Sequence, residues 1–275
     1  MGWWKQDQRY FDGAVAVITG GGSGLGAALV SRLTNQGATS VIVDIRPDRV
    51  ERILAETEAR GHSAFGWVCD VADAGAVQRL FRVVGDRFGR VDLLVNCAGR
   101  SMLCPFLDMT DDDLEWIIGP NLHGVVHCIR AAISLMPPGS RIVNVTSVSG
   151  RVPTPGEAYY SALKAAVVSL SESLNAELAG RGISTTVVLP GEMSTALFAE
   201  HPSWERRPSF QRRMEIDPDL VAHAILKGVR KGCFEVVRPR YMRVVFAIQR
   251  ISRTSFRRGV ARYWGKVEPQ IMEGE

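Results

Sequence analysis

The chain has 275 residues, of which 46% are hydrophobic and 23% are charged, and its formal net charge is +4. This composition is that of an ordinary globular protein and excludes a disordered, collagen-like or coiled-coil chain. No run of about 18 apolar residues predicts a membrane-spanning helix, and the polar start of the chain is unlike a signal peptide. We therefore expect a soluble, cytoplasmic protein with one catalytic-sized domain.

Short β-branched runs alternate with longer helical patterns along most of the chain, as in parallel sheets whose strands are joined by crossover helices. Strands are predicted at 14–18, 40–44, 63–68, 91–95, 141–146, 184–189 and 235–237. Helices are predicted at 24–36, 48–60, 73–88, 111–136, 156–179 and 218–231. The first two strands are apolar on consecutive residues, so both faces of the sheet should be covered. The pattern indicates an α/β fold: a doubly wound sheet of seven mainly parallel strands with helices on both faces.

A glycine-rich loop follows the first strand, with the sequence Thr19-Gly20-Gly21-Gly22-Ser23-Gly24-Leu25-Gly26. Glycines allow the backbone to approach a pyrophosphate closely, and the N-terminus of the next helix favours an anion. The second strand ends in Asp44, where a carboxylate can accept both ribose hydroxyls of NAD and would repel the 2'-phosphate of NADP. We expect NAD to be the preferred cofactor, although Arg46 could serve a phosphate.

Tyr160 and Lys164 are four residues apart at the start of a helical pattern, which places them on one helix face. A free phenol has a pKa of about 10 and is a poor base at neutral pH. We expect the neighbouring Lys164 ammonium to lower the pKa of Tyr160.

In order along the chain, these and further motifs resemble the short-chain dehydrogenase/reductase family from about Gly13 to Val237. The loop matches the family pattern T-G-x-x-x-G-x-G at Thr19, Gly20, Gly24 and Gly26. The other matches are Asp70 after the third strand, Asn96-Cys97-Ala98-Gly99 with a cysteine in place of the second asparagine, Asn121, Ser147, Tyr160, Lys164 and Pro190-Gly191-Glu192-Met193-Ser194-Thr195.

The resemblance implies a Rossmann-type fold and hydride transfer between a nicotinamide and a carbon that bears the substrate oxygen. Tyr160 would act as the general acid or base, Ser147 would bind the substrate oxygen, and Lys164 would also hold the nicotinamide ribose. Asn121 would serve the proton relay. The implied cofactor-binding residues are Thr19, Gly20, Gly22, Ser23, Gly24, Leu25, Gly26, Asp44, Asp70, Val71, Asn96, Ala98, Gly99, Tyr160, Lys164, Pro190, Gly191, Met193 and Thr195.

The segments that assemble the substrate pocket in this family are largely apolar here, which suits a hydrophobic alcohol or ketone. The candidate lining is Ser101, Met102, Leu103, Ser147, Val148, Val152, Pro153, Met193, Leu197 and Phe198. The loop 200–215 could act as a lid. No metal is required, and the pair His123 and His127 is a polar patch rather than a metal site without a third ligand.

The chain beyond Val237 is unusually basic, with nine positive and no negative charges between residues 238 and 266. Within 240–264, Arg243, Arg250, Arg253 and Arg257 share one face of a predicted amphipathic helix, and Val244, Ala247, Ile248 and Ile251 share another. This helix could pack over the pocket or a subunit interface, lie on an anionic membrane, or contact nucleic acid. We favour packing first and the membrane second, and we expect no nucleic-acid partner.

We therefore predict an NAD-dependent oxidoreductase acting on a hydrophobic secondary alcohol or ketone, such as a steroid, retinoid-like or lipid-derived compound. We expect three segments: an N-terminal extension (1–12), a catalytic domain (13–239) and a basic extension (240–275). The resemblance also implies a homodimer or homotetramer. The alternatives are an NAD-binding sensor or docking protein of the same fold, or a sister reaction such as epimerisation or dehydration with bound NAD.

Overall fold

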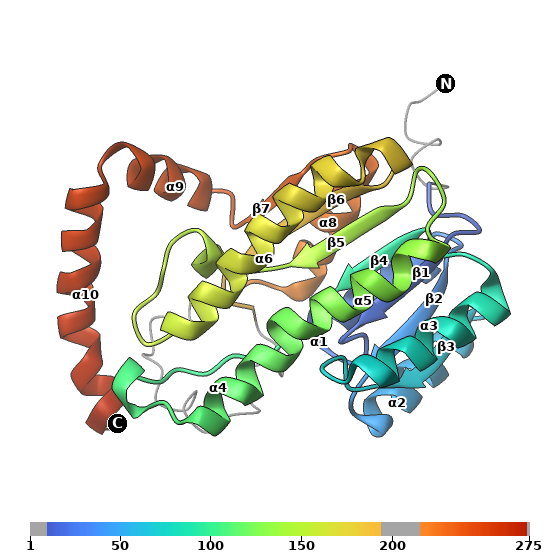
Figure 1. The fold of residues 1–275 in the computed structure, drawn as a ribbon, viewed down its shortest axis with the longest axis horizontal. Coiled ribbons are helices and arrows are strands. Elements are labelled where there is room, and N and C mark those ends of the chain that lie inside the picture. The colour runs from blue at the N-terminus through green and yellow to red at the C-terminus, as the bar shows by residue number, and fades with distance from the viewer. Residues whose placement is uncertain (1–9, 194–214, 274–275) are drawn as a thin grey trace.

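The computed structural model describes residues 10–193 and 215–273, which form one parallel sheet, the helices around it and a helical arm (Figure 1). The strands are β1 (Val15–Thr19), β2 (Thr39–Asp44), β3 (Ala64–Val68), β4 (Leu93–Asn96), β5 (Arg141–Val145), β6 (Ser184–Pro190) and β7 (Glu235–Arg238). Their order across the sheet is β3-β2-β1-β4-β5-β6-β7, and every neighbouring pair is parallel. The predicted doubly wound α/β fold is confirmed.

Helices cover both faces of this sheet. They are α1 (Gly24–Thr34), α2 (Pro47–Glu58), α3 (Ala74–Phe88), α4 (Asp111–Ile118), α5 (Gly124–Ala132), α6 (Ala158–Glu177), α8 (Pro218–Arg230), α9 (Met242–Ile251) and α10 (Arg253–Glu273). Ala16 and Ile18 of β1 pack into the core with α1 and α8, whereas Val15 and Val17 pack into the core with α3 and α5. Consecutive apolar residues in a strand therefore reflect burial on both sides, as the sequence predicted.

Local signals fix the ends of α3. The Asp73 carboxylate accepts hydrogen bonds from the backbone N–H groups of Gly75 (2.7 Å) and Ala76 (3.0 Å), which would otherwise have no partner in the first turn. The helix stops at Gly89, whose φ of 70° is left-handed. The predicted start and stop of this helix are thus explained by an aspartate cap and a glycine.

The prediction of one continuous helix over 111–136 was wrong. Residues Gly119–His123 form a π-helical turn between α4 and α5, and a short 3-10 turn, Ile133–Leu135, follows α5. Pro120 has no N–H to donate to the Trp116 carbonyl, which accepts a hydrogen bond from Arg100 Nη1 instead (3.4 Å). The proline therefore forces the extra residue into the turn, and Asn121 lies within it.

The prediction of one C-terminal amphipathic helix over 240–264 was also wrong. The backbone leaves the helical conformation at Ser252, with φ −130° and ψ 66°, and separates α9 from α10. We call these two helices the arm; it stands away from the sheet at the left of Figure 1. Arg253 and Arg257 consequently belong to a different helix from Arg243 and Arg250, so the four do not share one face.

The arm is attached to the body at two places. Met242 and Phe246 of α9 pack against Val168, Leu189 and Val237. Tyr263 and Trp264 of α10 pack against Leu103. In the part of the chain described here, no helix is long and apolar enough to cross a membrane.

Candidate active site

A cavity of about 600 Å³ lies at the carboxyl ends of the central strands. Its walls come from the segments after β1 to β6 and, on one side, from the arm. Ligands of open α/β sheets bind at this edge, where the crossover direction reverses between β1 and β4. The site is therefore where the topology predicts it.

The glycine loop forms one end of the cavity, with Gly20, Ser23, Gly24, Leu25 and Gly26 in its wall. A Cβ atom on Gly26 would lie 2.0 Å from the Gly20 carbonyl oxygen. Gly20 has a φ of +66°, and a Cβ there would lie 3.0 Å from the Ala98 backbone. Side chains are thus excluded at these two positions, which leaves the backbone N–H groups at the start of α1 open to an anionic ligand.

Asp44, at the end of β2, is buried in the wall next to this loop. Its Oδ2 accepts a hydrogen bond from Gly22 N (3.1 Å), and its Oδ1 accepts one from Arg46 N (3.1 Å). The Arg46 side chain forms an ion pair with Asp48 (Nε–Oδ1, 3.2 Å) instead of entering the wall. Arg49 does enter the wall. Asp70 and Val71, after β3, complete this end, with Asp70 Oδ1 accepting from Ala72 N (2.9 Å).

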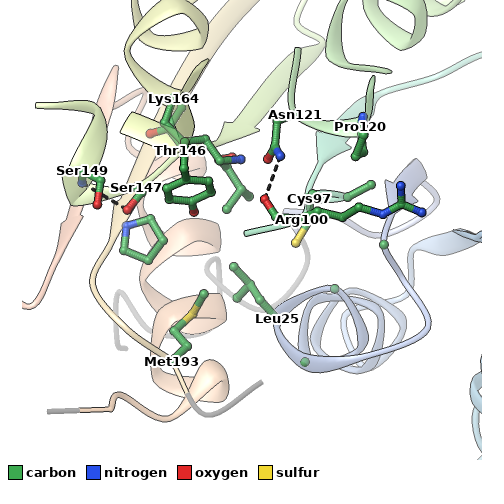
Figure 2. A pocket seen from close by; sticks show the side chains of 18 of the residues that line it. Leu25, Cys97, Arg100, Pro120, Asn121, Thr146, Ser147, Ser149, Lys164 and Met193 are labelled. Atoms are coloured by element: carbon green, nitrogen blue, oxygen red, sulfur yellow. Dashed lines mark hydrogen bonds between the residues drawn. The ribbon is translucent and has the colours of Figure 1, made fainter. Parts of the chain in front are cut away.

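At the other end of the cavity the structure brings together Ser147, Tyr160, Lys164 and Asn121. Tyr160 and Lys164 lie one turn apart on α6, and Ser147 follows β5. In Figure 2, Ser147, Lys164 and Asn121 lie across the cavity from Leu25 and Met193. Lys164 Nζ donates a hydrogen bond to the Val145 carbonyl (3.2 Å) and lies 5.5 Å from the centre of the Tyr160 ring. Ser147 Oγ accepts a hydrogen bond from Ser149 N (3.1 Å).

The electrostatics of Tyr160 differ from the expectation. Burial and the nearby Glu157 carboxyl raise the pKa of Tyr160, and a hydrogen bond with Ser147 opposes them only in part. Burial also lowers the pKa of Lys164 to about 8, so its ammonium is still protonated at neutral pH. Lys164 was expected to lower the pKa of Tyr160, but in this site that pKa lies above its ordinary value.

Asn121 is fixed by the π-helical turn. Its Nδ2 donates to the carbonyls of Arg100 (2.7 Å) and Ile117 (2.8 Å), while its Oδ1 is buried without a hydrogen-bond partner in the described protein. A Cβ on Gly99 would lie 2.8 Å from this Oδ1 and 3.4 Å from Lys164 Nζ. Asn121 Oδ1 and Lys164 Nζ thus lie on the same side of Gly99. Because buried acceptors normally have a hydrogen-bond donor, a bound water or ligand is expected to donate to Asn121 Oδ1.

Three predicted cofactor contacts are absent from the cavity wall, namely Thr19, Gly22 and Asn96. Thr19 Oγ1 accepts hydrogen bonds from the backbone N–H groups of Cys97 and Ala98 (both 3.1 Å), which fastens β1 to the loop after β4. Asn96 Nδ2 donates to Asn144 Oδ1 (2.8 Å) inside the sheet. Gly22 acts through its hydrogen bond to Asp44. These residues shape the site without lining it.

The predicted substrate lining is only partly found. Ser147, Val148 and Met193 line the cavity, whereas Ser101, Met102, Leu103, Val152 and Pro153 do not. Met102 is buried against Ile117, Tyr160 and Leu163, because the segment after Gly99 turns into the core. Thr195, Leu197, Phe198 and the proposed lid up to residue 214 lie outside the described residues.

Several wall residues were not predicted. Glu157 and Glu192 bring two carboxyl groups to the cavity, and the arm contributes Tyr241, Met242, Val245 and Tyr263. Burial and Glu192 raise the pKa of Glu157 to about 8, and its Oε2 accepts a hydrogen bond from Ser149 Oγ (3.3 Å). Glu157 precedes Tyr160 by three residues, a helical spacing that could have pointed to it. The arm residues had no local signal.

Comparisons with known proteins find relatives of one family. The model of the family described as short chain dehydrogenase matches residues 14–206. Oxidoreductase UcpA of Escherichia coli K12 is 34% identical over 220 residues, which are 79% of this chain and 80% of that protein.

Two solved structures have the same fold. A short chain dehydrogenase/reductase from Burkholderia phymatum, in complex with NAD, has a TM-score of 0.81 at 26% identity, covering 88% of this chain and 94% of that one. A short chain dehydrogenase from Burkholderia cenocepacia J2315, in complex with NADP, has a TM-score of 0.73 at 31% identity, covering 82% and 96%.

Proposed function

The chain belongs to the short-chain dehydrogenase/reductase family of oxidoreductases, which bind NAD or NADP, and we propose that it transfers a hydride between NAD and a hydrophobic secondary alcohol or ketone. One observation carries this proposal: Ser147, Tyr160, Lys164 and Asn121 meet at one end of a cavity whose other end is a glycine loop beside a buried aspartate. This supports Tyr160 as a general acid or base, because its phenol lines the same cavity as the glycine loop that would bind the dinucleotide.

The cavity fits the cofactor. The glycine positions that a Cβ would fill leave backbone N–H groups that would bind the pyrophosphate, the Asp44 carboxylate would accept the ribose hydroxyls, and Asp70 would lie beside the adenine. Lys164 would hold the ribose next to the nicotinamide. Bound there, the nicotinamide supplies the hydride acceptor or donor.

The residues of the chain supply position and protons. Ser147 Oγ holds the substrate oxygen beside the Tyr160 hydroxyl, and Tyr160 accepts the alcohol proton in oxidation or donates a proton to the carbonyl oxygen in reduction. Asn121 Oδ1 and Lys164 Nζ border the spot through which that proton would pass toward solvent. The raised pKa of Tyr160 keeps the phenol protonated at neutral pH, which suits it as the acid in carbonyl reduction.

The preference for NAD rests on Asp44. A fixed carboxylate beside the ribose would repel the 2'-phosphate of NADP. Arg46, the cation that could have served a phosphate, is paired with Asp48. Arg49 lines the same end of the cavity, and its positive charge would favour the 2'-phosphate of NADP. The ratio of NAD turnover to NADP turnover therefore decides between the two cofactors.

A hydrophobic substrate is supported by the wall at the catalytic end. Val148, Met193, Met242 and Val245 contribute apolar side chains to the wall of the cavity that Ser147 and Tyr160 also line. Such a wall favours a steroid, retinoid-like or lipid-derived alcohol over a sugar.

We also propose that the protein is a homodimer or homotetramer that pairs through α6. The side of this helix turned away from the sheet is exposed and consists mostly of small residues, including Ala162, Ala165, Ala166, Ser169 and Ser173. Small side chains let two helices approach closely.

The experiment is a turnover assay at the absorbance band of reduced nicotinamide, with NAD or NADP and a panel of hydrophobic and sugar alcohols. We expect turnover with NAD and at least one hydrophobic alcohol. Tight NAD binding with no turnover across the panel would instead favour an NAD-binding sensor, or an epimerase or dehydratase with bound NAD.

A further inference from the structure

The helix α9 carries an apolar ridge that the rest of the described protein does not cover. Val244, Ile248 and Ile251 are spaced as neighbours on one helix face, and their exposed fractions are 61%, 53% and 86%. The opposite side of the same helix, with Met242 and Phe246, is packed on the body. The helix is therefore already anchored on one side, so the exposed ridge is an outer surface.

Exposed arginines lie beside this ridge on α9 and along the rest of the arm. Arg243 and Arg250, seven residues apart, form a row beside the ridge on α9. The other exposed basic residues are Arg240, Arg253, Arg257, Arg258, Arg262 and Lys266. No acidic residue occurs between 238 and 266. Arg243, Arg250, Arg253 and Arg257 also line a hollow between the arm and the body together with Glu172 and Glu235, whose carboxylates are paired with Arg151 (2.8 and 3.3 Å).

The helix α10 is also amphipathic. Its inner residues Phe256, Val260, Tyr263 and Trp264 are partly buried, whereas its arginines are exposed. The apolar ridge and the two exposed arginines beside it on α9 define what we call the arm's outer face: Val244, Ile248 and Ile251 with Arg243 and Arg250. The exposed basic residues of α10 add positive charge to the arm.

We propose that the arm's outer face docks the protein on an anionic membrane surface. Isoleucine and valine side chains would enter the boundary between headgroups and acyl chains, while arginines beside them meet lipid phosphates. A second copy of the chain fits this face poorly, because a symmetric contact would bring the arginines of both copies together. Nucleic acid would satisfy the arginines but leave the apolar ridge against a polar backbone.

The docking surface adjoins the cavity. Met242 and Val245 of α9 line the cavity together with Tyr241 just before the helix, and Val244 and Ile248 lie on the outer side of α9. A docked arm would therefore hold the catalytic end of the cavity near the lipid, where a hydrophobic alcohol or ketone partitions. This link to substrate supply rests on the proposed function, whereas the docking itself does not.

The test is cosedimentation of the full-length protein with vesicles of phosphatidylcholine, with and without phosphatidylglycerol, at low and high salt. We expect binding only to vesicles that contain phosphatidylglycerol, with loss of binding at high salt. Two variants report on the two halves of the surface: the ridge variant Ile248→Ser/Ile251→Ser and the charge variant Arg243→Gln/Arg250→Gln. Each should lower the partition coefficient by about tenfold or more.

The controls make matched changes elsewhere. Leu220→Ser replaces an apolar residue of α8 that is 59% exposed, and Arg82→Gln/Arg181→Gln removes two exposed arginines from the body. Both controls should bind vesicles as the parent protein does. Thermal melting shows whether each variant is folded, and the charge variant keeps the test intact if the ridge variant does not fold.

Three results would overturn the proposal: no binding of the parent protein to anionic vesicles at low salt, unchanged binding by both arm variants, or a smaller oligomer in the ridge variant, which would assign the ridge to a second copy. Because the assay contains no alcohol or ketone, a failure of docking is distinguishable from a failure of the proposed reaction.

Discussion

The carboxyl of Glu157 lies close enough to the Tyr160 phenol to raise its pKa, and burial raises the pKa of Glu157 itself to about 8. Below about pH 8 this carboxyl is mostly neutral and affects Tyr160 little. Above that pH it is charged and opposes formation of phenolate. The two groups therefore titrate together, and the oxidation reaction should report both.

Glu157→Gln removes this charge while keeping the size of the side chain. Oxidation requires deprotonated Tyr160, so its rate rises with pH, and a lower Tyr160 pKa should move the rising limb of the kcat profile to lower pH. The effect should be confined to alkaline pH, where Glu157 is ionised. The measurement is the pH profile of kcat for oxidation, with Glu177→Gln, on the exposed end of α6, as the control. An unchanged profile would exclude the coupling.

Asp44→Ser tests the choice of cofactor. Loss of the carboxylate removes the repulsion of the 2'-phosphate and an acceptor for the ribose, so the ratio of kcat/KM for NAD to that for NADP should fall by about tenfold or more. Asp86→Ser, an exposed aspartate of α3, should leave the ratio unchanged. If Asp44→Ser also leaves it unchanged, another residue such as Arg49 sets the preference.

The sequence predicted most of the residues at the two ends of the site, because their types and spacing carry the chemistry. It could not predict the directions of side chains that have a competing partner. Thr19 accepts from the backbone of the loop after β4, and Asn96 donates to Asn144 of β5, so both partners come from segments distant in the sequence. Glu157 was not predicted, although its spacing of three residues from Tyr160 is typical of neighbours on one helix face.

At the scale of elements, the connection from β1 to α1 leaves no room for side chains. Gly26→Ala would place a Cβ 2.0 Å from the Gly20 carbonyl oxygen, so the loop must shift. We expect the free energy of unfolding to fall by roughly 1–3 kcal/mol and the affinity for NAD to fall with it. Chemical denaturation and an NAD titration measure the two effects.

Gly180→Ala is the matched control for this change. Nothing lies within 4 Å of a Cβ at Gly180, so the same substitution should leave both quantities near their parent values. Equal losses in the two variants would show that the effect belongs to glycine replacement in general and not to the cradle.

All seven predicted strands and most helices were found, because period, capping and glycine stops are local signals. The break between α4 and α5 was missed, although Gly119-Pro120 in a helical pattern was a readable warning. The break at Ser252 had no such warning, because neither proline nor glycine occurs there. The two arm helices that it separates pack at different places on the body.

For the molecule as a whole, the arm connects the end of the chain to the catalytic end of the cavity. Tyr263 reaches the cavity wall from α10, and Trp264 beside it contacts Leu103. The sequence predicted an amphipathic extension and favoured its packing over the pocket or a subunit interface. Its two attachments to the body could not be predicted, because they depend on contacts between distant segments. The segment boundaries at residues 12 and 239 stay a prediction.

Tyr263→Ala should weaken the closure of the cavity by the arm. Loss of a large apolar side chain from the wall should lower kcat/KM for a bulky hydrophobic substrate by about tenfold, mainly through KM. The affinity for NAD should not change, since the glycine loop and Asp44 lie at the other end. Gly259→Ala, also on α10 and with open space around it, is the control. An equal loss of NAD affinity would show that the arm supports the fold and not the substrate.

The most direct test of the proposed reaction compares the parent protein with Tyr160→Phe, which removes one hydroxyl. For each protein, NAD affinity is measured by titration and turnover is measured at the absorbance band of reduced nicotinamide with a hydrophobic alcohol that the parent oxidises. We predict unchanged NAD affinity and a loss of kcat by about 100-fold or more, the usual value of a general acid or base. Turnover by Tyr160→Phe at the parent rate would contradict the assignment of Tyr160 and the mechanism built on it.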